Sequence, residues 1–147
     1  MAADGSGGMT GRGNMTRERL SQIFYLEKEQ KMWEEKLKEL EAASLIKGQE
    51  INGMPYANTG ETSDSVMSLI IRKQTIIDII KEIQNRIDQQ KKEIYEYINT
   101  IEDSLLRQIV VYRCVSCMNW VQVANRIGGG NTAESVRKIY ERSIPKK

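Results

Sequence analysis

The 147-residue chain contains no histidine, one phenylalanine and two prolines. It therefore lacks the side chain that most often serves as an acid or base near neutral pH, and its carboxylates fall on exposed faces of predicted helices. Long hydrophobic runs are missing too, since a membrane span needs about 18 consecutive apolar residues. The richest stretch, residues 66–83, is interrupted by Arg72, Lys73, Asp78 and Lys81. We therefore expect neither an enzyme nor a membrane-bound protein.

Cysteine is scarce, and the only two, Cys114 and Cys117, have the spacing of a metal-binding pair. One such pair supplies two of the four ligands of a zinc site, and without histidine the others would have to come from a second chain. The start of the chain lacks the apolar core of an export signal. We expect free thiols in a reducing cytoplasm, no metal and no cofactor, with Cys114 filling apolar space and Cys117 in a bend.

Charge is unevenly distributed along the chain, although the net charge is only +2. From Ser104 onward there are eight Lys or Arg and two acidic residues, which gives +6. Residues 1–103 hold the remaining 14 basic and 18 acidic residues, a net of −4. A small basic C-terminal part is typical of proteins that bind nucleic-acid phosphates.

Residues 1–14 contain five glycines and almost nothing apolar, so we expect a flexible tail or a cloning remnant. Residues 15–101 hold two segments whose apolar positions are spaced by three and four, as in a coiled coil. The first seam is Ile23, Leu26, Gln30, Trp33, Leu37, Leu40 and Ser44; the second is Leu69, Lys73, Ile76, Ile80, Ile83, Ile87, Gln90, Ile94, Tyr97 and Ile101.

Between the two segments, residues 47–63 contain three glycines and Pro55. We predict a loop there, with Asp64 as the N-cap of the second helix. The two helices would fold into a long antiparallel hairpin. Either the hairpin buries its seam by itself, or a second copy covers the rest in a homodimer or higher oligomer.

Residues 102–147 predict a separate domain of three short helices, at about 103–114, 119–127 and 132–143. Asn119 and Gln122 have the spacing of a capping box. Gly128 begins a glycine run that would end the second helix and reverse the chain, and Asn131 or Thr132 would cap the third helix.

The third helix has an apolar and a polar face. Val136, with Ile139 or Tyr140, is expected to face the core. The outward residues are the candidate DNA contacts, because hydroxyl and cationic side chains reach phosphates and base edges. These residues are Thr132, Ser135, Arg137, Lys138 and Arg142.

A resemblance to a known family is carried by the segment IEDSLLRQIVVYRCVSCMNWVQVANRIGGGNTAESVRKIYERSI. Its specific parts are LRQIVVYR, NW, VA, RIG and ESVRKIYER, although the GGGN turn is longer than usual. The segment resembles the sigma-region-4-like helix-turn-helix domain of small phage regulators, including the ArpU-like and RinA-like groups. That resemblance implies a phage or prophage origin, duplex-DNA binding through the last helix, and control of late or other phage genes. Host RNA polymerase is a candidate partner.

These observations predict an all-α chain with a coiled-coil-like hairpin ahead of a helix-turn-helix domain, acting as a transcription regulator. Two alternatives stay open. Small terminase subunits, which recognise DNA for packaging, also join a helix-turn-helix to a coiled coil, and ring assembly would favour that reading. A coiled-coil interaction protein is the other, and the basic C-terminal part argues against it.

Overall fold

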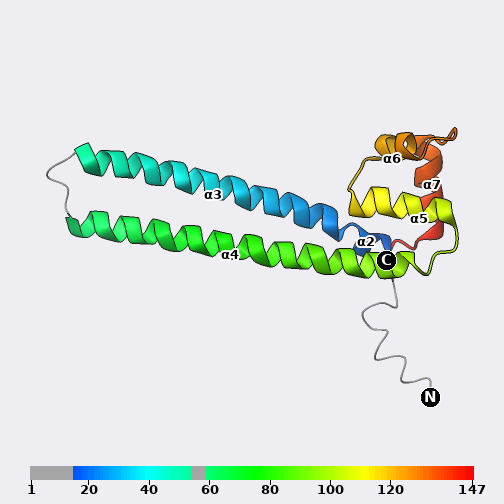
Figure 1. The fold of residues 1–147 in the computed structure, drawn as a ribbon, viewed down its shortest axis with the longest axis horizontal. Coiled ribbons are helices and arrows are strands. Elements are labelled where there is room, and N and C mark those ends of the chain that lie inside the picture. Colours follow the sequence, from blue (N-terminus) through cyan, green and yellow to red (C-terminus); the bar gives the residue numbers. More distant parts are fainter. Residues whose placement is uncertain (1–14, 54–58) are drawn as a thin grey trace, which may run out of the picture. The chain divides into compact units, whose positions relative to one another are not determined.

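The computed structural model describes residues 15–53 and 59–147, and all regular secondary structure in these ranges is helical (Figure 1). This confirms the all-α class. The elements are α2 (Arg17–Leu20), α3 (Gln22–Gly53), α4 (Thr59–Ile98), α5 (Ser104–Val110), the π-helical segment η1 (Val111–Val115), α6 (Trp120–Ile127) and α7 (Ala133–Ser143). Among the described residues, none of the helices is long and apolar enough to cross a membrane. The predicted tail, residues 1–14, lies outside the described residues.

The two long helices extend further toward each other than the sequence predicted. Helix α3 ends at Gly53, and α4 begins at Thr59, so most of the predicted loop at 47–63 is helical. Asp64 lies inside α4 and is not its N-cap. A formed helix gains one hydrogen bond for each added residue, and this outweighs the cost of about 1 kcal/mol for a glycine in a helix. Pro55 of the predicted loop lies outside the described residues.

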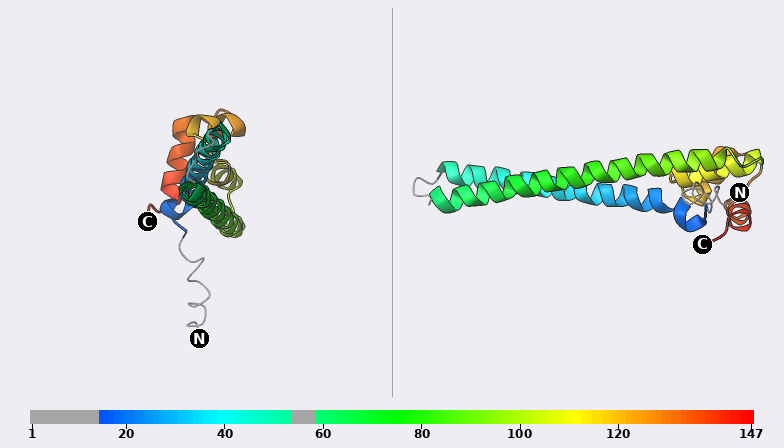
Figure 2. Two further views of the ribbon diagram at one scale, coloured as in Figure 1. Left: turned by 90° about the vertical axis from the view of Figure 1, so that its left-hand side faces the viewer. Right: turned by 90° about the horizontal axis from the view of Figure 1, so that it is seen from below.

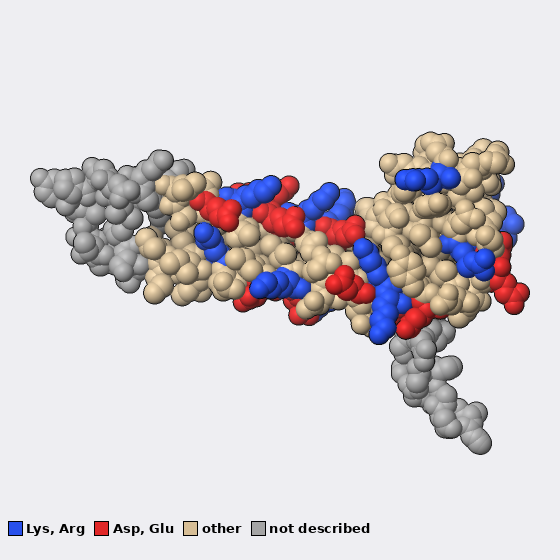
Figure 3. Space-filling model, viewed as in Figure 1, with Lys and Arg blue, Asp and Glu red and all other residues tan. Residues whose placement is uncertain are grey.

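The described residues form two compact units. The paired-helix unit, residues 27–86, contains segments of α3 and α4 that lie side by side (Figures 1 and 2). The Nε2 atom of Gln30 donates a hydrogen bond to Oε1 of Gln84 at 2.9 Å. The predicted seam is shielded from solvent: Leu69, Ile76 and Ile83 are buried, while Trp33, Leu37 and Leu40 are half-buried. Acidic and basic side chains are interspersed on the outer face of these helices (Figure 3).

The terminal unit combines residues 15–26 with residues 87–147. The structure therefore groups the residues differently from the predicted boundary at residue 102. Each short C-terminal helix has an apolar stripe that must be covered, and α2, the start of α3 and the end of α4 contribute to the same core. Its fully buried side chains are Leu20, Ile23, Ile94, Ile109, Val110, Val123, Val136 and Ile144.

Backbone hydrogen bonds join α2 to the segment after α7. The amide of Arg17 donates to the Pro145 carbonyl at 2.8 Å, and that of Glu18 to the Lys146 carbonyl at 3.2 Å. Amides in the first turn of a helix have no acceptor within it, so the C-terminal segment supplies two. Thr16 caps the same turn by accepting a hydrogen bond from the Arg19 amide. The two segments lie side by side in Figures 1 and 2.

Candidate nucleic-acid interface

The first short helix begins as predicted but does not continue as an α-helix. The carboxylate of Asp103 accepts a hydrogen bond from the Leu105 amide at 3.1 Å and caps α5. From Val111 the backbone widens into the π-helical segment η1, where the Ser116 amide donates to the Val111 carbonyl at 3.0 Å. The segment leads to Cys117, whose φ of 57° is unusual for a residue with a side chain.

The capping box predicted at the start of α6 is confirmed. The Gln122 amide donates to Oδ1 of Asn119 at 2.9 Å, and the Asn119 amide donates to Oε1 of Gln122 at 3.0 Å. On the inner face of α6, Val123 and Ala124 are buried. The small side chain of Ala124 allows a neighbouring helix to approach closely.

The glycine run forms the reversal between α6 and α7. Gly128, Gly129 and Gly130 have φ values of 71°, 64° and 82°, a region that favours glycine over residues with a Cβ atom. The side-chain amide of Asn131 donates to the Gly128 carbonyl at 2.7 Å. The long GGGN turn is therefore an ordered connection.

Thr132 and Ser135, two of the predicted DNA contacts, form a second capping box at the start of α7. The hydroxyl of Thr132 accepts from the Ser135 amide at 3.1 Å, and the hydroxyl of Ser135 accepts from the Thr132 amide at 2.9 Å. The Ser135 hydroxyl also donates to the Thr132 carbonyl at 3.0 Å. Both hydroxyls thus already have partners in the protein.

The outward cations of α7 differ in how far nearby carboxylates offset them. Arg137 lies 3.0 Å from Glu141 and 3.9 Å from Glu134, and Lys138 lies 3.3 Å from Glu134. Arg142 is exposed and has no ion pair with residues 15–45 or 65–147, the ranges in which side chains are described. The spacings of three and four along the helix predict such pairs, but the sequence analysis used Glu134 and Glu141 only in the net charge and not as partners of these cations.

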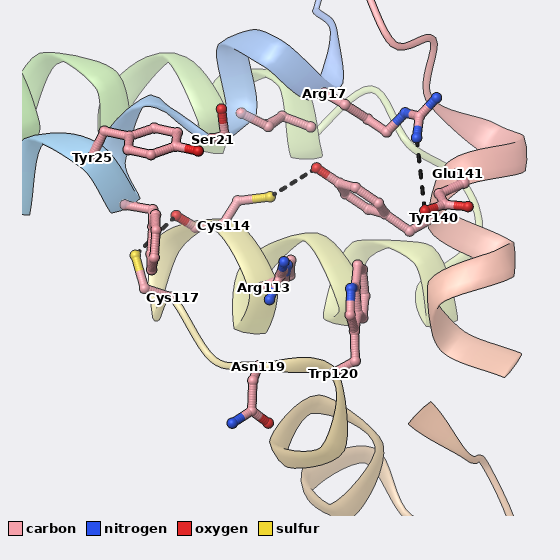
Figure 4. Close-up of a pocket in the computed structure, with 12 residues that line it drawn as sticks. Arg17, Ser21, Tyr25, Arg113, Cys114, Cys117, Asn119, Trp120, Tyr140 and Glu141 are labelled. Carbon is pink, nitrogen blue, oxygen red and sulfur yellow. Dashed lines mark hydrogen bonds and ion pairs between the residues drawn. The ribbon is translucent and has the colours of Figure 1, made fainter. Parts of the chain in front are cut away.

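On the inner face of α7, Val136 and Tyr140 are buried, while Ile139 is only half-buried. The structure therefore selects Tyr140 from the two predicted alternatives. The Tyr140 hydroxyl lies 3.5 Å from the Cys114 sulfur (Figure 4), and its ring meets Trp120 edge to face at 5.2 Å between centroids. Cys114 is buried in this core, as predicted. Burial raises the pKa of Cys114 to about 11 and also raises the pKa of Tyr140.

Cys114 and Cys117 are both free thiols. Within the described ranges, no three Cys, Asp or Glu side chains come together in a way that could hold a metal ion.

A cavity of about 400 Å³ lies beside Tyr140 in the terminal unit (Figure 4). Sequence reasoning missed it because its walls come from segments more than 100 residues apart. The signal for it in the sequence was that Phe24 and Tyr25 fall outside the predicted seam, since large aromatic side chains usually find cover.

Comparisons of the chain with family models, with curated proteins and with solved structures give no match.

Proposed function

We propose that this protein binds duplex DNA through a helix-turn-helix made of α6, the glycine turn and α7. Helices α3 and α4 would form the antiparallel hairpin that carries it. The observation that supports this most is the two-sided character of α7. Val136 and Tyr140 anchor one side in the core, while the other side exposes Lys138 and Arg142. A helix held in this way can enter the major groove without losing its packing.

The charge of the terminal unit supports the same proposal. Arg126 of α6 is exposed and lies 5.9 Å from the ring centroid of Tyr112. Arg142, Lys146 and Lys147 follow on α7 and the segment after it, and all are exposed. Cations of this kind contact phosphates and give sequence-independent affinity that falls with salt. Arg142 is the strongest phosphate candidate, because neither Glu134 nor Glu141 is paired with it.

The biological role we propose is that of a phage or prophage transcription regulator working in the bacterial cytoplasm. The resemblance of the C-terminal segment to sigma-region-4-like regulators supports this role, and the protein would act by binding rather than by catalysis. Binding as a homodimer would place two copies of α7 on two half-sites about one helical turn of DNA apart. Contact with host RNA polymerase belongs to the same proposal.

The experiment is a fluorescence-anisotropy titration of DNA from upstream of the coding sequence, at two salt concentrations. Arg142→Ala should weaken binding similarly on all sequences and lower the salt slope by about 1. Arg137→Ala and Lys138→Ala should have smaller effects, because carboxylates already offset these cations. Glu134→Gln should strengthen binding, because it releases Lys138 from a carboxylate at 3.3 Å, while Arg137 keeps its closer partner Glu141.

Lys92→Ala is the control for loss of a positive charge, since Lys92 is exposed on α4. Circular dichroism should confirm that every variant is folded. Wild-type affinity in Arg142→Ala, Arg137→Ala and Lys138→Ala alike would refute α7 as the DNA-contacting element. If Lys92→Ala lost as much DNA affinity as Arg142→Ala, the loss would be explained by net charge alone and not by a contact of α7.

A further inference from the structure

The cavity beside Tyr140 has the size of a small-molecule site. Its volume of about 400 Å³ falls in the range of about 300–1,000 Å³ typical of ligand pockets. Its walls come from α2, the start of α3, η1 with Cys117, the start of α6, and α7. All of these segments belong to the terminal unit.

Aromatic rings dominate two sides of the cavity. Phe24 and Tyr25 lie edge to face with centroids 5.3 Å apart, and Trp120 and Tyr140 form a second such pair at 5.2 Å. Phe24 and Tyr25 remain 41% and 61% exposed, so a guest that covered them would gain hydrophobic stabilisation. A planar aromatic guest suits such walls because ring faces and edges attract one another.

The charged groups of the cavity favour an anion. Arg17 and Arg113 line it together with one carboxylate, Glu141. Cys114 and Tyr140 are neutral at physiological pH, because burial raises the pKa of both. The lining therefore carries one net positive charge.

The two guanidinium groups are held in place by the protein. The Nε atom of Arg17 donates to the Ile144 carbonyl at 3.1 Å, and its Nη1 atom lies 3.9 Å from the Glu141 carboxylate, a long contact for an ion pair. Arg113 donates to the Met118 carbonyl at 2.9 Å and stacks 4.5 Å from the Trp120 ring centroid. A planar guanidinium fixed in this way is suited to carboxylate or sulfonate oxygens.

One wall of the cavity has an uncommon backbone. The π-helical turn contributes Arg113 and Cys114, and the positive-φ residue Cys117 follows it. A regular α-helix through these positions would present other side chains to the cavity. Single π-helical turns occur frequently at functional sites.

We propose that this cavity binds a small planar aromatic anion, of the aromatic carboxylate or sulfonate class. Its rings would lie against Phe24, Tyr25 and Trp120, with the anionic group toward the two arginines. Binding itself does not depend on the proposed DNA function. Because α6 and α7 both line the cavity, an occupant would also fix the two proposed DNA-binding helices relative to each other.

The test uses 8-anilinonaphthalene-1-sulfonate as the probe and the full chain with Trp33→Phe, which leaves Trp120 as the only tryptophan. We expect saturable binding of one probe per chain with quenching of Trp120 fluorescence. The uncharged analogue N-phenyl-1-naphthylamine should bind at least about tenfold more weakly. Equal binding of the two probes would overturn the assignment of an anion, and unsaturable binding would overturn the site.

Two exposed tyrosines of the terminal unit provide matched variants. Tyr25 lines the cavity and Tyr95, which is 49% exposed, does not. Tyr25→Glu should weaken binding of the sulfonate probe by at least about tenfold, while Tyr95→Glu should bind like the parent chain. Equal effects of the two substitutions would overturn the proposal.

A measurement on the unsubstituted chain covers the case in which Tyr25→Glu fails to fold. Cys117 is half-buried and lines the cavity, whereas Cys114 is buried. A bound probe should slow the alkylation of Cys117 by iodoacetamide. An unchanged rate at a saturating probe concentration would overturn the proposal.

Discussion

The Nε atom of Arg17 donates a hydrogen bond to the Ile144 carbonyl at 3.1 Å, joining residues 127 positions apart in the chain. Ile144 is the C-cap of α7, and its side chain is 1% exposed. The first turn of α2 and the end of α7 thus share a hydrogen bond above a common core. We therefore expect the stability of the proposed DNA-binding helices to depend on α2.

Ile144→Ala should destabilise the protein by about 2–4 kcal/mol, because it removes buried methyl groups and leaves a space that neighbours only partly fill. Urea denaturation followed by circular dichroism measures the change. Lys147→Ala, at an exposed position near the same end, should change the free energy of unfolding by less than about 0.5 kcal/mol. Equal effects of the two substitutions would mean that the C-terminal segment does not dock on the core.

Chains starting at Met1 and at Met15 should unfold at the same temperature, since residues 1–14 offer no apolar pattern for docking. A chain starting at Gln22 should unfold at a clearly lower temperature. It loses the Thr16 cap, the buried Leu20 and the two hydrogen bonds to the segment after α7. Differential scanning calorimetry compares the three chains. A large loss on removing residues 1–14 alone would contradict the prediction.

The buried thiol of Cys114 should make stability depend on pH in the alkaline range. Loss of hydration raises the pKa of Cys114 from 9.0 to about 11, although its contact with Tyr140 acts in the opposite direction. The folded state therefore holds the proton more tightly than the unfolded state. This contribution is complete below pH 9 and is lost as the pH rises toward 11.

Cys114→Val removes this titration while keeping an apolar side chain of similar size. Between about pH 8 and about pH 10.5, the wild type should lose on the order of 2 kcal/mol more stability than the variant. Urea denaturation at the two pH values tests this. Parallel losses in both proteins would show that Cys114 titrates alike in the folded and unfolded states.

We predict self-association through the paired-helix unit. Val66, Met67, Ile70 and Ile71 of α4 are all exposed, and an apolar surface this continuous usually marks an interface. Substituting both Ile70 and Ile71 by Glu should produce monomers in sedimentation velocity at micromolar concentration. Asn85→Glu, at an exposed position of α4, is the control.

These exposed positions test association better than the seam does. Ile87 is only 2% exposed and Ile80 is half-buried, as predicted for seam residues, so a charge at Ile87 would damage the fold itself. A wild type that is strictly monomeric would exclude this interface. A ring of many copies would favour the packaging alternative over a dimeric regulator.

The sequence by itself determined the features that depend on neighbours a few positions away. The spacing of seven residues between Leu69, Ile76 and Ile83 predicted the buried face of α4, because two turns of a helix take about seven residues. Asn119 and Gln122 defined a helix start by their spacing alone. The prediction of a loop over the whole of 47–63 was wrong. It relied on the low helix propensity of glycine, which does not show how far an already formed helix extends.

Only the tertiary structure decided which apolar helix faces pack against one another. Periodicity shows that α6 and α7 each have an apolar face, but it does not say that Arg17 lies beside Ile144 or that Tyr140, rather than Ile139, turns inward. The π-helical turn and the cavity between Tyr25 and Trp120 follow from that packing. Side chains that are distant in the chain pack together where their shapes fit and apolar area is buried. The local spacing of residues does not determine either of these.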